Sequence, residues 1–228
     1  FLSQKKSKEN TAFRQEVSLY RGIQLFNENN YKEALKLFVE GKKSKTIEIN
    51  QKCKYWEAET TYILQDYQTA LIKFSSLNTL VKQHKVGTFL LLDYNIGYCH
   101  FKLKEYTKAS KSFEMFLQKD GILDGIKHDA FTRLGDSYFA TTNYKKAIIA
   151  YKKVTDDFGI GADYTTYQIG MSYGFINENE AKIIALKKVN SAFPISHLKD
   201  DALYQLGNTY SALKDSKNAH IAYNRLAK

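Results

Sequence analysis

The sequence predicts an all-α fold, a solenoid of about six helical hairpins, and three observations support this. Apolar residues recur at helical spacing along most of the chain, in segments separated by short polar turns. A fixed pattern of small and aromatic residues returns every 35 to 39 residues, which is a period typical of helical repeats. The chain contains a single proline, Pro194, so little interrupts the helices.

The repeated pattern is clearest in residues 134–154. Gly135 is followed by Ala147 twelve positions later and by Tyr151 after four more. Side chains larger than a methyl group hold crossing helices apart, so we expect small residues where the two helices of a hairpin cross. We expect the aromatic residue to fill the space between its own first helix and the next hairpin. The other sets of the pattern are Gly22, Ala34 and Phe38; Ala58, Ala70 and Phe74; Gly97, Ala109 and Phe113; Gly170, Lys182 and Leu186; and Gly207, Ala219 and Tyr223.

Polar turns mark the predicted hairpins in order along the chain. In the first hairpin, an apolar stripe that includes Val17 and Phe26 ends at the polar run NENN, and a second helix follows at once. The later turns read LQD, LKE, TTN, NEN and LKD, and such short links suit antiparallel neighbours. In four hairpins the second helix opens with a tyrosine three residues before its alanine, at Tyr31, Tyr67, Tyr106 and Tyr144.

We therefore expect a flexible N-terminal segment over residues 1–10 and a single repeat array over residues 11–228. The chain begins with Phe1 rather than methionine, so we expect a processed end or a piece of a longer protein. The repeats are predicted near residues 15–46, 47–83, 88–121, 123–158, 160–193 and 196–228.

The complete pattern resembles the tetratricopeptide repeat. That repeat has a small residue, an aromatic residue three later (here Tyr138, Tyr173 and Tyr210), an alanine at twelve and an aromatic residue at sixteen. The resemblance covers about residues 15–228. It implies a right-handed superhelix in which the first helix of each repeat lines a concave groove for peptides or partner proteins, and it implies no catalysis. The fifth repeat departs from the pattern, with Lys182 where alanine belongs, and is a candidate bend.

A second resemblance concerns the joint before the last repeat. Residues Ala192–Ser196 and Asp201–Gly207 are similar to a joint of bacterial envelope tetratricopeptide repeat proteins. In that joint an aromatic residue, a proline and a serine precede an Ala-x-x-x-Leu-Gly motif. The resemblance favours a bacterial envelope or periplasmic location over the cytoplasm.

The net charge of +10 raises electrostatic binding to nucleic acid or to an anionic surface as an alternative function. However, the 34 basic residues are spread along the chain, which is typical of solvated helix faces. We therefore expect no specific nucleic-acid partner and only weak attraction to anionic surfaces. The sequence contains no run of about 20 apolar residues, so we expect no membrane span, while peripheral or envelope association stays open.

The candidate partner-binding residues lie within three positions of the small residue of each first helix. Most of those in the N-terminal half are aromatic, and tyrosine and tryptophan are favoured as rigid interface anchors. The alternative is that these rings only complete the core between repeats. The candidates are Tyr20, Trp56, Glu59, Tyr94, Asn95, Tyr98, Arg133 and Asp136.

The resemblance also bears on the kind of ligand. The family's clamp for a chain-terminal carboxylate uses lysine, asparagine and arginine at groove positions of successive repeats. Here Tyr20 and Trp56 occupy two of these positions, and Asn95 and Arg133 are the suitable residues. This argues against a ligand held by its terminal carboxylate.

The sequence contains no P-loop, no GxSxG and no HExxH motif. Cys53 and Cys99 form no CxxC pair, and the five histidines do not cluster with them, so we interpret both as structural thiols. We therefore expect no metal, no cofactor and no enzymatic activity.

These observations predict a protein-interaction scaffold that binds a peptide or partner protein in the groove of its first helices. Self-assembly into a homo-oligomer is an alternative, because the chain ends at Lys228 on a second helix with no polar capping helix after it. Electrostatic binding to anionic surfaces is the other alternative.

Overall fold

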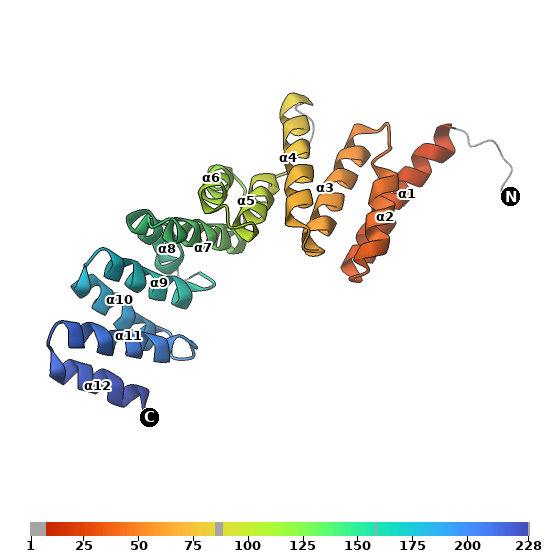
Figure 1. Cartoon of the computed structure of the whole chain (residues 1–228). Coiled ribbons are helices and arrows are strands. Elements are labelled where there is room, and N and C mark those ends of the chain that lie inside the picture. Colours follow the sequence, from red (N-terminus) through yellow and green to blue (C-terminus); the bar gives the residue numbers. More distant parts are fainter. Residues whose placement is uncertain (1–7, 85–88, 158, 228) are drawn as a thin grey trace. The chain divides into compact units, whose positions relative to one another are not determined.

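The computed structural model describes residues 8–84, 89–157 and 159–227, which form twelve helices and contain no strand (Figure 1). The predicted all-α helical-repeat fold is therefore confirmed. Residues 1–7 of the segment that we expected to be flexible lie outside the described residues. The helices are α1 (Lys8–Asn27), α2 (Tyr31–Gly41), α3 (Ile47–Ile63), α4 (Tyr67–His84), α5 (Leu92–Lys102), α6 (Tyr106–Leu117), α7 (Asp124–Ala140), α8 (Tyr144–Asp156), α9 (Ala162–Phe175), α10 (Asn179–Ala192), α11 (Lys199–Ala212) and α12 (Ser216–Leu226).

The chain divides into two compact units, Phe1–Ser112 and Phe113–Lys228, with the boundary inside α6. In the first unit each helix from α1 to α5 packs against the next one along the chain, and α1 also contacts α3. In the second unit α7 to α12 pack in the same consecutive way. Helices that contact chiefly their chain neighbours are the defining feature of a solenoid. The prediction of one uninterrupted array over residues 11–228 stays a prediction.

Glycines lie where the two helices of a hairpin touch, as the sequence pattern predicted. A methyl group added to Gly22 in α1 would lie 2.6 Å from the ring of Phe38 in α2. The ring of Tyr151 in α8 occupies the corresponding space over Gly135 in α7. The same contact joins Gly207 to Tyr223 in the last hairpin. In all three pairs, the ring sixteen residues after the glycine packs directly on its backbone.

A ring at position sixteen can also reach the next hairpin, as the second part of the pattern predicted, and Phe74 does so. Phe74 of α4 is fully buried in one cluster with Ala58 of its own first helix and with Leu92 and Ile96 of α5. Burial of such a ring is worth about 3–5 kcal/mol, judged by the cost of its truncation to alanine. One ring therefore stabilises two interfaces, within its hairpin and between hairpins.

Where this ring is a tyrosine, its hydroxyl group needs a buried acceptor. The hydroxyl of Tyr151 donates a hydrogen bond to Asp136 Oδ1 at 2.8 Å, and that of Tyr223 donates to Asn208 Oδ1 at 2.8 Å. Both acceptors directly follow the glycine of their hairpin. Because a buried hydroxyl without a partner is costly, the residue after the glycine and the ring at position sixteen are matched.

The fifth hairpin replaces the usual alanine with Lys182, and a second glycine accommodates the longer side chain. A methyl group added to Gly174 would lie 3.0 Å from Cδ of Lys182, so the lysine stem packs on the α9 backbone. Burial lowers the pKa of Lys182. Gly170 keeps its normal role, with Leu186 at 3.0 Å from the position of an added methyl group. A bend at this hairpin stays a prediction.

Each hairpin turn contains a non-glycine residue in the left-handed conformation, with φ between 60° and 66°. A backbone N–H after the turn bonds back into the first helix, for example Asn143 N–H to Tyr138 O at 2.8 Å. This is the Schellman type of helix end, in which glycine is the preferred residue. The six residues are Asn29, Gln65, Lys104, Thr142, Asn177 and Lys214.

We predict that Gly135→Ala destabilises the protein by about 1–3 kcal/mol, although alanine is the better helix former. The new methyl group would collide with the ring of Tyr151, which is fully buried and tethered to Asp136. Gly125→Ala in the same helix is the control, because an added methyl group there meets nothing within 4 Å. Urea unfolding should show a loss for the first variant and no loss for the second; equal effects would contradict the packing role of Gly135.

We also predict that Thr142→Gly stabilises the protein, by on the order of 0.5–1 kcal/mol, because a β-branched residue is strained at φ 60°. The backbone hydrogen bond from Thr142 N–H to Phe139 O, 3.0 Å long, is retained in this variant. Lys153→Gly in the right-handed helix α8 is the control and should destabilise by about 0.5–1 kcal/mol. Thermal melts that move both variants in the same direction would disprove the strain at Thr142.

Candidate functional site

A pocket of about 230 Å³ lies in the first unit, and we call it the tyrosine pocket. It is formed mainly by α3 and α5, the first helices of consecutive hairpins, and Phe74 of α4 also lines it. Four of the eight sequence-predicted residues line it. Its lining residues are Glu59, Tyr62, Ile63, Phe74, Tyr94, Asn95 and Tyr98.

The rings of the tyrosine pocket pack against one another. Tyr94 and Tyr98 are one helical turn apart on α5, and their ring centroids lie 4.9 Å apart in an edge-to-face arrangement. Tyr62 of α3 meets Tyr98 edge to face at 6.5 Å. All three rings are partly exposed, so they present a preformed aromatic surface with little conformational freedom left to lose.

A carboxylate lies among these rings. Glu59 Oε1 accepts a hydrogen bond from Asn95 Nδ2, which also contacts the Tyr55 hydroxyl at 3.1 Å. Burial raises the pKa of Glu59, and hydrogen bonds from Tyr55 and Asn95 oppose that rise only in part. Within the described residues, no lysine, arginine or histidine forms an ion pair with Glu59 or contributes to its pKa. When Glu59 is ionised, the pocket therefore holds a negative charge that its neutral donors offset only in part.

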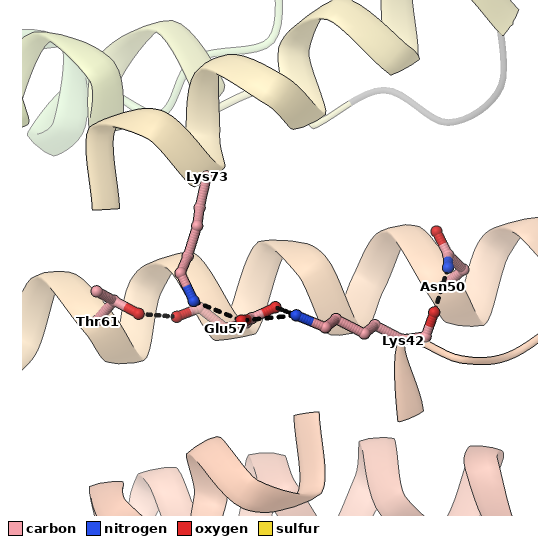
Figure 2. A network of polar contacts seen from close by, with 5 residues as sticks. All are labelled: Lys42, Asn50, Glu57, Thr61 and Lys73. Atoms are coloured by element: carbon pink, nitrogen blue, oxygen red, sulfur yellow. Dashed lines mark hydrogen bonds and ion pairs between the residues drawn. The ribbon is translucent and has the colours of Figure 1, made fainter. Parts of the chain in front are cut away.

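Glu57, two residues earlier on α3, is the opposite case (Figure 2). Its side chain is 6% exposed and its carboxylate is bound by Lys42 Nζ at 2.8 and 2.9 Å and by Lys73 Nζ. Burial alone would raise the pKa of Glu57, but the hydrogen bonds and charges of the two lysines outweigh it and lower the pKa. The three residues thereby connect the end of α2, α3 and α4.

The two glutamates differ because successive helical residues are rotated by about 100°, so Glu57 and Glu59 face different neighbours. Glu57 faces Lys42 and Lys73, whereas Glu59 faces α5. The hairpin of Glu59 has Phe74 at position sixteen rather than tyrosine. Glu59 follows the small residue Ala58, and its hydrogen bonds come from Tyr55 of its own helix and Asn95 of α5 instead of from position sixteen. The charge of Glu57 is used inside the fold, and that of Glu59 is available to the pocket.

Two other predicted residues lie outside the tyrosine pocket. Trp56 is half-buried against the core cluster of the first hairpin, with ring centroids 5.1 Å from Phe26 and 6.2 Å from Phe38. This packing corresponds to the alternative in which such rings complete the core. Tyr20 of α1 is 57% exposed. A binding role for either residue stays a prediction.

The remaining predicted residues, Arg133 and Asp136, lie in the second unit and bond to each other. Arg133 Nη1 donates to Asp136 Oδ2 at 2.8 Å, while Oδ1 accepts from the hydroxyls of Tyr151 and Tyr164 at 2.8 and 2.9 Å. Burial raises the pKa of Asp136, against the effect of these three partners. Asp136 thus satisfies buried hydroxyls within the fold. The signal for this in the sequence was the tyrosine, rather than phenylalanine, at position 151.

The cysteines fit the structural interpretation. Both are fully buried free thiols, and burial raises the pKa of Cys53 and of Cys99 to about 12, so the reactive thiolate is disfavoured. The part of the chain that the structure describes contains no group of three or more histidine, cysteine, aspartate or glutamate residues that could hold a metal ion. None of the helices in that part is both long and apolar enough to span a membrane.

The two glutamates of α3 should respond to neutralisation in opposite directions. Glu57→Gln removes a paired charge and should lower the free energy of unfolding at pH 7, by on the order of 1–3 kcal/mol. That loss should shrink as the pH falls, because a lowered folded-state pKa gives stability that is present above the unfolded pKa and lost on acidification. Glu59→Gln should raise the free energy of unfolding at pH 7. This gain should also shrink at low pH, because a carboxyl with a raised pKa destabilises the fold only when ionised.

Urea unfolding of the wild type and both variants at several pH values measures these differences. Glu48→Gln, a surface variant on the same helix whose glutamate pairs with Lys52 in solvent, should change little. Loss of stability in Glu59→Gln at pH 7 would contradict the interpretation of Glu59 as an incompletely compensated charge.

Comparisons with known proteins give the family and the fold. Two family models, both described as tetratricopeptide repeat, match the chain, one at residues 92–120 and 129–159 and the other at residues 200–228. These matches fall on repeats that the spacing of small and aromatic residues predicted. No curated protein matches the sequence.

Solved structures share the fold at low sequence identity. A tetratricopeptide repeat protein from Parabacteroides merdae has a TM-score of 0.67 and 12% identity, covering 93% of this chain and 78% of its own. YrrB, a tetratricopeptide repeat protein, has a TM-score of 0.65 and 17% identity over 82% of this chain and 89% of its own. MamA has a TM-score of 0.64 and 17% identity over 77% and 90%. The matched repeats, together with this shared fold, support the tetratricopeptide repeat family for this chain.

Proposed function

We propose that this chain is a protein-interaction scaffold that binds a peptide segment of a partner on the face formed by its first helices, with the tyrosine pocket as the main contact. The observation that carries the proposal is the pocket itself: three partly exposed tyrosines and two polar groups converge from α3 and α5. Helical repeats commonly bind through such faces. The absence of enzymatic activity and an envelope location stay predictions.

The composition of the pocket supports binding rather than packing alone. Interface hot spots are rich in tyrosine, tryptophan and arginine, in places where a partner side chain is fully desolvated. Ile63, 42% exposed, adds apolar surface at the pocket, and the amide of Asn95 supplies a directional polar group. A groove of this kind suits an amphipathic helix or an extended peptide.

One of the similar solved structures, that of YrrB, supports a peptide as the ligand. The solved structure of YrrB is described as that of a tetratricopeptide repeat protein with an unusual peptide-binding site. The family's carboxylate clamp is a poorer model for this chain, because Asn95 is bonded to Glu59 and Tyr55, and Arg133 to Asp136. We therefore propose that the ligand is held by side chains along its length.

The test is a phage-displayed library of random 12-residue peptides, selected on the wild-type protein, followed by fluorescence anisotropy with the synthetic peptides. We expect Tyr94→Ala with Tyr98→Ala to weaken binding about tenfold or more, because the pair supplies two of the partly exposed rings that line the pocket. Ile63→Arg, at an exposed position, should also weaken binding by filling the pocket without removing a buried group.

Tyr204→Ala is the matched control, since this tyrosine of α11 is 51% exposed and lies outside the pocket. Circular dichroism checks that each variant is folded. Peptides that bind both pocket variants as well as the wild type would refute the pocket as the main contact. Light scattering over a range of protein concentrations tests the self-assembly alternative, which predicts a mass that rises with concentration.

A further inference from the structure

We propose that the tyrosine pocket selects a cationic side chain, lysine or arginine, of the bound peptide, with its charged group on the carboxylate of Glu59 and its methylene groups against Tyr94 and Tyr98. This inference rests on the proposed function and specifies the chemistry of the ligand. It follows from the charge, the rings and the size of the pocket.

The charge of Glu59 favours a cationic partner. The chain carries 34 basic residues and a net charge of +10, and two lysines bind Glu57 only two residues away. Within the described residues, Glu59 has only the neutral partners Asn95 and Tyr55. A buried carboxylate is stabilised by a paired charge. A positive group on the ligand would therefore stabilise ionised Glu59, and Glu59 would stabilise that group in return.

The repeat pattern explains why this carboxylate is left for a ligand. In the second unit, the acceptors that follow the glycine are satisfied from inside, Asp136 by Tyr151 and Asn208 by Tyr223. In the second hairpin, Phe74 stands at the position of those tyrosines and offers no hydroxyl. Glu59 therefore occupies an acceptor position whose usual internal donor is missing.

The rings around Glu59 are also suited to a cation. The faces of tyrosine rings attract lysine and arginine through cation–π interactions, worth about 0.5–2 kcal/mol according to desolvation. Tyr94 and Tyr98 can pack on the methylene groups of a long side chain while Glu59 receives its head. The volume of about 230 Å³ is below the roughly 300–1,000 Å³ of typical small-molecule sites, which favours one side chain over a larger ligand.

Among the described residues, four groups that bear or polarise charge face Glu59, and none of them replaces a cation. Asn95 of α5 and Tyr55 of α3 bond to it, and Tyr62 and Cys99 lie near enough for Glu59 to raise their pKa values. The tyrosines and the thiol are neutral at pH 7, because burial raises the pKa of each further above it. A basic group brought by the peptide would be the positive charge that these described neighbours do not supply.

The test uses sets of synthetic 12-residue peptides on an array, with neutral flanking residues and a central lysine, arginine, norleucine or glutamate. Norleucine keeps the methylene groups of lysine and removes its charge. We expect wild-type protein to bind the best lysine or arginine peptides about tenfold or more tightly than their norleucine versions, measured by anisotropy in solution. In Glu59→Gln this preference should fall to about twofold or less, because the charged head of the peptide side chain loses its partner.

Glu48→Gln removes the same charge from the exposed part of α3 and should keep the full preference for lysine, which separates a local contact from the general field. Equal binding of lysine and norleucine peptides that still depends on Tyr94 and Tyr98 would overturn this inference and leave the proposed function standing. A preference that survives in Glu59→Gln would overturn the role of Glu59. The absence of any peptide that depends on Tyr94 and Tyr98 would overturn both.

Discussion

The contact between a glycine of the first helix and the ring sixteen residues later is the constraint on which the hairpins depend. It allows Tyr151 to lie directly on the backbone at Gly135, and Phe38 to do the same at Gly22. Each ring is then close enough to reach the following hairpin as well, as Phe74 does with Leu92 of α5. Because a ring such as Phe74 serves both purposes, order in one hairpin favours order in the next.

The same geometry sets the chemistry of the position after the small residue. Where the ring is tyrosine, that position holds an acceptor, Asp136 or Asn208, that is used inside the fold. Where the ring is phenylalanine, it has no hydroxyl group to bond, so the position after the small residue need not hold an internal acceptor. In the second hairpin this position holds Glu59. Helix α3 therefore carries one carboxylate that ties helices together, Glu57, and one that is exposed to the tyrosine pocket. We regard this division as the basis of the proposed peptide selection.

The sequence predicted the hairpins well because their signal is local and repeated. Glycine at 22, 135 and 207 with a ring sixteen residues later can be recognised without knowing any long-range contact. The left-handed conformation of Lys104 and Thr142 could not be predicted, because these residue types do not favour it and only the surrounding helices impose it. The same limit applies to the interaction of Glu57 with Lys42 and Lys73, since many other lysines are available along the chain.

For the site, the sequence placed four of the pocket residues near the small residues of the first helices, but it could not separate binding rings from packing rings. Trp56, two residues before its small residue, and Tyr98, one residue after its own, are both aromatic candidates, yet Trp56 packs on Phe26 and Phe38. Asp136 showed a usable signal, the tyrosine at position 151, which identifies it as an internal acceptor. What distinguishes Glu59 is that its described donors, Asn95 and Tyr55, are both neutral, and this becomes visible only when the partners of each acceptor are compared.

The most direct measurement is nuclear magnetic resonance spectroscopy of the isotope-labelled protein, to detect nuclear Overhauser effects between glycine Hα protons and aromatic ring protons. The account predicts strong effects for Gly22 with Phe38, Gly135 with Tyr151 and Gly207 with Tyr223, together with ring-current shifts of these Hα resonances. Unshifted glycine resonances without such effects, in a protein that is helical and folded, would contradict the claim that these contacts organise the hairpins.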